Sequence, residues 1–349
     1  MYFKVKVTLH KLTIGFHEQE SLTFRLGDQH GTSVMIRPPT VDEKEKQKGE
    51  FLVCFAFTEE EPPSGINEVF ESLIQNATSE HATEQDEKQG ALLSRDFQNF
   101  ASQVRHRLYE SIRRTVRIIR WRWALTSSHN PIASTSGVSW SLDNHSWLTM
   151  PEDLHFEGGR FEFYFRISAR LHGEMEALIK GGENEPLGHE LFLEAWALRR
   201  TNPRSALIIG MSAAEVGFKQ CIGKLVPPAE WLAHHAPTPP LDKMLSNYLP
   251  LLPAKLKIEG RVLRPSKKIR SSIKAGIEAR NHSVHLGSEP PKGKDLKELL
   301  LSIRDLLYLL DFYCGFEWAL EYIRDEVRAE MVEEFELKST NAYSVIDLR

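Results

Sequence analysis

A short run near residue 280 gathers three side chains that could bind an anion and move protons. At 100° per residue, Arg280 lies inside the predicted packed face of a helix between Ser266 and Gly287, while Asn281 and His285 lie one turn apart at its edge. The apolar side chains that predict this face are Ile269, Ile273, Ile277 and Val284. A guanidinium on a packed face is costly unless an anion or another acceptor meets it. Guanidinium can hold a phosphate with two donors, and imidazole can exchange protons near neutral pH.

Another helix is predicted earlier in the chain, and a glycine is expected to end the helix that carries Arg280. Asn202-Pro203 is typical of a helix start, and the helix is expected to reach about Ile222. Its apolar stripe consists of Leu207, Met211, Ala214, Phe218 and Ile222. Glu215 and Lys219, four residues apart, are interpreted as a surface ion pair or as auxiliary groups of the site. Gly287 offers the left-handed stop of the later helix.

The run Arg280-Asn281-x-x-x-His285 resembles the RX4–6H motif of HEPN domains, which also prefer a polar residue directly after the arginine. The order of elements is similar to the abortive-infection type of this family. A capped helix carrying Ser212-Ala213-Ala214-Glu215-Val216 comes roughly 60 residues earlier, and a long helix follows. The resemblance covers residues 187–332, while the N-terminal part resembles no family that we can name.

The resemblance implies a helical bundle, a homodimer and a metal-independent endoribonuclease that needs no cofactor. RNA cleavage through its own 2′-OH needs a proton acceptor, a proton donor and positive charge on the phosphorane. The resemblance assigns these roles to Arg280, Asn281 and His285, and two facing subunits would supply two copies of His285. The auxiliary candidates are His282, Glu215 and Lys219, although His282 projects away from the others and is more simply an exposed histidine.

The biological role that the resemblance implies is antiviral defence by abortive infection, with RNA such as tRNA as the target. The alternative is a non-catalytic HEPN protein with an RNA-binding or regulatory role. In either case the N-terminal domain is expected to sense a trigger, such as a phage-derived molecule or a protein partner.

The fold class expected is α+β, with a mixed α/β domain over residues 1–180. Antiparallel strands are predicted from alternating apolar positions at 3–9 and 22–26 and from a short apolar run at 49–58, and alternation predicts further strands between 137 and 171. A short helix is expected at 66–77, followed by an acidic loop. A plausible linker over 180–186 precedes the all-α domain of residues 187–332 and a tail over 333–349.

A long basic helix, or two shorter ones, is predicted from Ala91 to Ala124, a segment that contains no glycine or proline. It holds eight arginines against two acidic residues, a local charge of 8 − 2 = +6. Arg113, Arg117 and Arg120 are expected on one face, either as a solvated surface or as a surface that contacts RNA phosphates. Two tryptophans at the end of the helix, Trp121 and Trp123, are candidates for base stacking or for the core.

An apolar stripe over about four heptads predicts a long packed segment near the C-terminus, which Gly315 could divide. It consists of Leu299, Ile303, Leu306, Leu310, Tyr313, Leu320, Ile323 and Val327. Such a stripe can be covered within the bundle or, in part, by a second subunit.

Composition narrows the class of protein further. The 349 residues carry 44 Lys and Arg against 48 Asp and Glu, a net charge of −4, so whole-molecule charge does not indicate nucleic-acid binding. No apolar run reaches the ~18 residues of a membrane span, and the N-terminus lacks a secretory pattern, so a cytoplasmic protein is expected. The three cysteines lack the spacing of a zinc site or a disulfide framework, and neither a phosphate-binding loop nor HExxH occurs.

Overall fold

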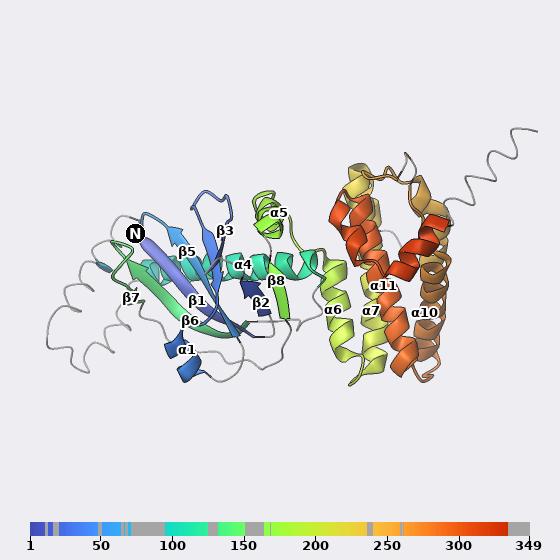
Figure 1. Ribbon diagram of the computed structural model, residues 1–349, viewed down its shortest axis with the longest axis horizontal. Helices are drawn as coiled ribbons and strands as arrows, with labels where there is room; N and C mark the ends of the chain where they lie inside the picture. The colour runs from blue at the N-terminus through green and yellow to red at the C-terminus, as the bar shows by residue number, and fades with distance from the viewer. Residues whose placement is uncertain are drawn as a thin grey trace, which may run out of the picture. The chain divides into compact units, whose positions relative to one another are not determined.

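The computed structural model (Figure 1) describes residues 1–10, 13–16, 21–47, 51–63, 66, 69–70, 95–124, 132–150, 164–167, 169–235, 240–258, 260 and 262–333. The chain divides into two compact units, Met1–Arg120 with Asn130–Asn184, and Trp121–His129 with Glu185–Arg349. The fold is α+β, as expected. Residues 121–129 group with the second unit, although the sequence had placed them in the first domain. The acidic loop, most of the helix expected at 66–77 and the tail beyond Glu333 lie outside the described residues.

The first unit contains a six-stranded antiparallel sheet in the order β3-β4-β5-β1-β6-β7. The strands, in that order, are Leu22–Arg25, Ser33–Arg37, Phe51–Glu59, Tyr2–His10, Ile132–Ser141 and Leu148–Thr149. A separate parallel pair joins β2 (Thr13–Phe16) to β8 (Tyr164–Ile167). The alternation predicted for the first strand is confirmed, because Phe3, Val5, Val7 and Leu9 are all buried.

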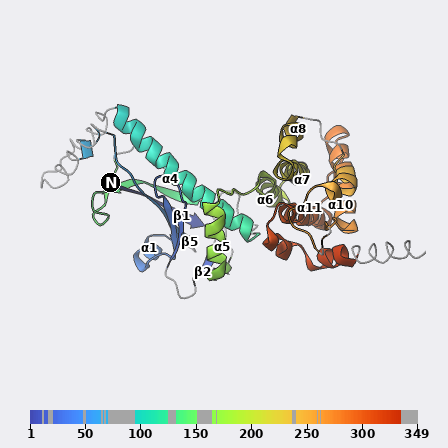
Figure 2. The same ribbon diagram turned by 90° about the horizontal axis from the view of Figure 1, so that it is seen from above.

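One face of this sheet is covered by α4 (Arg95–Arg122), the long basic helix. Phe3 of β1 packs edge-on against Phe100 of α4, with ring centroids 5.6 Å apart. Phe70 lies between Phe97 and Trp140 on the same side. Figure 2 shows α4 on this face and the short α1 (Val41–Lys46) on the other. Helix α5 (Ala169–Lys180) lies beside β3, where the His172 ring is 3.0 Å from the Thr23 carbonyl oxygen.

The described part of the second unit is mainly helical. Its longer helices are α6 (Leu187–Leu198), α7 (Pro203–Leu225), α8 (Glu230–His235), α10 (Lys267–His285) and α11 (Gly293–Tyr313). Shorter turns are η2 (Pro227–Ala229), α9 (Leu241–Lys243), η3 (Met244–Tyr248), η4 (Leu249–Leu251) and η5 (Glu317–Tyr322). The predicted start of α7 is confirmed, since the Asn202 side chain accepts a hydrogen bond from the Ser205 N–H at 3.2 Å.

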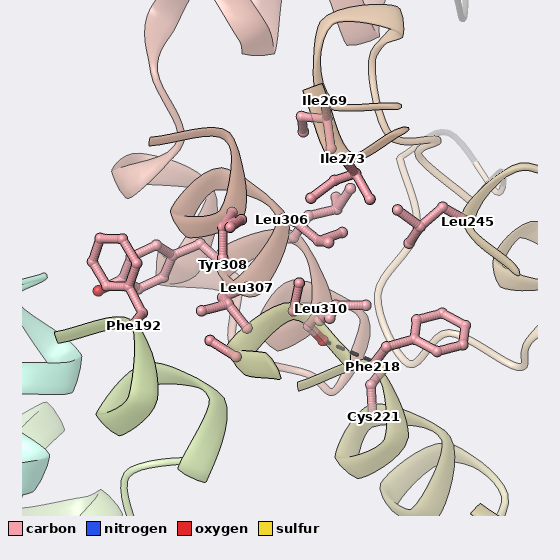
Figure 3. Close-up of a cluster of buried hydrophobic side chains, with 14 of the residues drawn as sticks. Phe192, Phe218, Cys221, Leu245, Ile269, Ile273, Leu306, Leu307, Tyr308 and Leu310 are labelled. Carbon is pink, nitrogen blue, oxygen red and sulfur yellow. Dashed lines mark hydrogen bonds between the residues drawn. The ribbon is translucent and has the colours of Figure 1, made fainter. Parts of the chain in front are cut away.

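One hydrophobic core holds these helices together (Figure 3). Leu306, Leu307 and Leu310 of α11 are buried with Phe218 of α7 and Ile273 of α10. The long C-terminal stripe is buried within the single chain except for the half-buried Leu320, so packing inside the unit explains it without a second subunit. Gly315 divides it as expected, because its φ of +107° is a conformation that side chains rarely adopt.

Glycines let the helices of this core approach closely. A Cβ at Gly210 of α7 would lie 2.6 Å from Leu300 Cδ2, and one at Gly276 of α10 would lie 2.6 Å from Met211 Sδ. A Cβ at Gly217 would come closer still to Leu307 Cδ2 of α11. These neighbours are themselves buried, so they have little room to move.

We expect Gly217→Ala to lower the free energy of unfolding by about 1–3 kcal/mol, because overpacking outweighs the gain in helix propensity. Gly223→Ala is the matched control in the same helix, since the nearest atom to its Cβ would be Cγ of the exposed Glu230, at 3.4 Å, close to ordinary contact. We expect this control to be neutral or slightly stabilising. Urea unfolding of both variants measures the difference, and equal effects would contradict the close packing described here.

Within the described residues, none of the helices is both long enough and apolar enough to cross a lipid bilayer.

Candidate functional site

The helix that carries Arg280, Asn281 and His285 has well-defined ends. At its start, the Ser266 side chain accepts a hydrogen bond from the Ile269 N–H at 3.2 Å. At its end, the N–H groups of Leu286 and Ser288 both donate to the His282 carbonyl oxygen, at 3.0 and 3.3 Å. Gly287 has a φ of +67°, so the predicted left-handed stop is confirmed.

The packed face of α10 differs from the predicted one at its C-terminal end. Its buried residues are Ile269, Ile273, Gly276 and Ser283. Val284 was expected in the stripe, but it is 53 % exposed. The reason is the position of the face: it runs through Gly276 and Ser283, and Val284 is turned about 100° from Ser283. Arg280 remains on the packed face, between these two small residues.

The charge of Arg280 is met by Glu215 of α7. Arg280 Nη1 donates to Glu215 Oε1 at 2.6 Å, and the two side chains are only 28 % and 26 % exposed. The expected ion pair between Glu215 and Lys219 is therefore wrong, because Glu215 pairs with Arg280 instead. In the described part of the chain, Lys219 has no ion pair. Arg280 reaches the carboxylate from α10, and the partial burial of both side chains reduces the screening of their charges by water.

The other residues of the motif face solvent. Asn281, His282 and His285 are exposed, whereas Arg280 turns toward α7. Arg280 and His285 are five positions apart, so they point about 140° apart around the helix. The structure therefore places the two on one helix end without directing them at one point within a single chain.

Two residues near the motif were not found from the sequence. Arg204 is exposed in the first turn of α7, and its Nη2 lies 3.5 Å from the Gly287 carbonyl oxygen. It is 83 positions from that glycine, so only the fold brings them together. Ser283 is buried beside the motif, and in the described structure its Oγ has no hydrogen-bond partner.

The arginines of α4 do not form one exposed row. Arg113 and Arg117 are exposed, and Arg113 pairs with Glu110 at 2.8 Å. Arg120 is only 2 % exposed, which corrects its expected place on the surface. The end of α4 is buried on every side from residue 118 to 122, so the angle around the helix no longer decides exposure there.

Trp121 and Trp123 belong to the core and not to a stacking surface. They are 1 % and 7 % exposed. The Trp121 ring N–H donates to Asp311 Oδ2 at 2.8 Å, and the His189 ring nitrogen Nε2 lies 2.8 Å from the same oxygen. The Tyr308 hydroxyl donates to the Trp121 carbonyl oxygen at 3.1 Å. These bonds satisfy polar groups that would otherwise be costly to bury.

The described residues contain no group of three or more His, Cys, Asp or Glu side chains arranged to hold a metal ion. Cys54, Cys221 and Cys314 are free and buried. Comparisons with known protein families, with curated proteins and with solved structures found no match.

We expect Glu215→Gln to lower the free energy of unfolding by roughly 1–2 kcal/mol, because the half-buried Arg280 loses its ionised acceptor. Lys219→Gln is the matched control on the same helix and should change stability by less than about 0.5 kcal/mol. Urea unfolding of the two variants measures both effects. Equal losses would show that Arg280 does not depend on Glu215.

Proposed function

We propose that this protein is a metal-independent endoribonuclease of the HEPN type, which cleaves RNA such as tRNA in abortive infection. The observation that carries the proposal is the end of α10. There, a half-buried arginine is oriented by a carboxylate from a neighbouring helix, and an amide and an imidazole on the same helix end are exposed to solvent. The proposed bundle is the described helical part of the second unit.

Glu215 gives Arg280 a fixed direction. Its carboxylate accepts a hydrogen bond from one terminal nitrogen of the planar guanidinium. A phosphate could accept hydrogen bonds from the N–H groups on the other edge. Arg204 adds positive charge beside Gly287, and Lys219 follows Glu215 by one turn on α7. We propose both as auxiliary phosphate contacts. Asn281 would donate from its amide to a phosphate oxygen.

His285 would carry the proton transfers. Cleavage needs one group that takes the 2′-OH proton and one that protonates the leaving 5′-oxygen. A single chain offers His285 and, farther around the helix, His282, so we propose that a homodimer supplies the second imidazole. The exposed side chains of Val284 and Leu286, 53 % and 72 % exposed, flank His285 and favour such an interface.

The first unit would sense the trigger, a phage-derived molecule or a protein. Its helix α4 presents Arg113 and Arg117 to solvent, and we propose that these two contact RNA phosphates in a sequence-independent way.

The second candidate is a non-catalytic HEPN protein with an RNA-binding or regulatory role. The observation that favours it is the same ion pair, because Glu215 already neutralises Arg280. In that case the motif would serve as a structural helix end.

We expect the wild-type protein to cut total tRNA in the presence of EDTA into defined fragments with cyclic-phosphate or 2′/3′-phosphate ends. His285→Ala should slow cleavage by at least about 10²-fold, the usual loss when a general acid or base is removed. His235→Ala, which removes an exposed histidine from α8, is the matched control and should keep full activity. Thermal unfolding and sedimentation check that each variant is folded and unchanged in oligomeric state. A folded His285→Ala protein with full activity would contradict the mechanism, and a gel shift without fragments would favour the second candidate.

Replacing Arg113 and Arg117 with Gln should flatten the dependence of log Kd for single-stranded RNA on log salt concentration. The expected change is roughly 0.7 log–log units per lost phosphate contact. Fluorescence anisotropy over a salt series measures the slope. An unchanged slope would show that Arg113 and Arg117 do not contact RNA and that this face of α4 is simply solvated.

A further inference from the structure

The sheet of the first unit has a second face that α4 does not cover. We call it the cationic face and define it by Lys4, Lys6, Arg37, Phe55, Phe57 and Trp147. Side chains alternate between the faces of a strand, so the buried Phe3 and Val5 point to α4, and Lys4 and Lys6 point the other way. Lys4 stands opposite Phe57 and Lys6 opposite Phe55 in the β1–β5 register. All six residues are partly exposed.

Aromatic rings and cations interleave on this face. The Phe55 and Phe57 rings stack with centroids 5.8 Å apart, and Trp147 lies edge-on to Phe57 at 6.4 Å. The Lys4 ammonium lies 3.7 Å from the centre of the Trp147 ring, and the Arg37 guanidinium lies 5.1 Å from that of Phe55. Phe55 and Phe57 lie on β5, one of the two central strands, and their partly exposed rings present flat apolar surface that another planar group could cover.

The charges of the cationic face are only partly balanced. Glu43 of α1 pairs with Lys6 at 2.6 Å and with Arg37 at 2.7 Å. In the described part of the chain, Lys4 forms no ion pair. Partial burial and the neighbouring Lys6 charge lower the pKa of Lys4. An anion placed beside Lys4 and Lys6 would relieve the repulsion between them.

We propose that the cationic face binds single-stranded RNA, with phosphates at Lys4 and Lys6 and with bases packed against Phe57 and Trp147. A ligand that fits must carry regularly spaced negative charge and planar groups that can leave their own stack, and single-stranded nucleic acid has both. The choice of RNA over DNA rests on the proposed function. Binding itself does not, because it is measured without cleavage.

Other occupants match fewer of these observations. An acidic peptide would use the two lysines but would have no need of Phe57 and Trp147. Double-stranded RNA keeps its bases stacked inside the helix, so it offers the rings no planar face.

The test uses the full-length protein with His285→Ala, so that cleavage does not interfere, and a fluorescein-labelled oligouridylate of about 12 nucleotides, within the site size of known single-strand binders. We expect Phe57→Leu, which keeps an apolar side chain, to weaken binding at least about five-fold in anisotropy titrations, the loss of one base stack. Lys4→Gln should weaken binding and flatten its salt dependence by roughly 0.7 log–log units.

Two control variants match these changes outside the cationic face. Lys180→Gln removes a positive charge from α5, and Trp231→Leu removes a 69 %-exposed aromatic ring from α8. Both should bind the oligonucleotide as the parent protein does. Circular dichroism checks folding, and Lys4→Gln keeps the test decisive if Phe57→Leu does not fold.

The proposal is overturned if the parent protein does not bind the oligonucleotide, or if Phe57→Leu and Lys4→Gln bind as the controls do. Equal competition by DNA of the same sequence would overturn RNA as the occupant. Full competition by polyglutamate, with no effect of Phe57→Leu, would indicate an acidic protein partner instead. None of these results depends on the tRNA cleavage assay, so failure here and failure of the nuclease proposal are distinguishable.

Discussion

The ion pair between Arg280 and Glu215 constrains how α7 and α10 meet within the hydrophobic core of the second unit. A guanidinium on the packed face of α10 must meet an acceptor, because burying it alone would cost several kcal/mol. Two further contacts bring α7 and α10 together in antiparallel directions: Gly276 lies against Met211, and Arg204 lies near Gly287. The absence of a side chain at Gly276 lets the two helices approach closely one turn before Arg280, where the guanidinium meets the carboxylate of Glu215.

This arrangement separates the parts of the motif. The ion pair draws Arg280 toward the bundle, while the helix turns Asn281 and His285 outward. A phosphate that is to meet both a guanidinium and two imidazoles then needs groups from more than one helix end. Because the long C-terminal stripe is already buried within one chain, the proposed interface must lie elsewhere, and the exposed Val284 and Leu286 indicate where.

Local signals in the sequence were sufficient for much of the fold. Alternation identified β1, and an asparagine followed by proline marked the start of α7, because each depends on neighbours in the chain. Partners distant in the chain could not be predicted. Glu215 looked like the partner of Lys219, since helical spacing shows only local neighbours, whereas Arg280 reaches it from 65 positions away.

Burial also follows tertiary contacts that periodicity does not contain. Arg120 has nearly the same angular position on α4 as the exposed Arg113, yet it is buried because the last turn of the helix is enclosed on every side. Val284 was misplaced for the opposite reason, since the packed face of α10 is narrower than its apolar residues indicate. The types and spacing of Arg280, Asn281 and His285 suggested the motif, which stays a hypothesis, but the direction in which each side chain points came from the fold.

In the proposed dimer, one cleavage site uses His285 from two chains. Wild-type and His285→Ala proteins can be unfolded together, refolded at known ratios and assayed for tRNA cleavage, with sedimentation to confirm that the subunits have mixed. If two imidazoles act on one phosphate, activity falls with the square of the wild-type fraction, so an equal mixture retains about a quarter of full activity. A linear dependence, with about half of the activity retained in an equal mixture of confirmed mixed dimers, would show that each chain acts alone and would contradict this account.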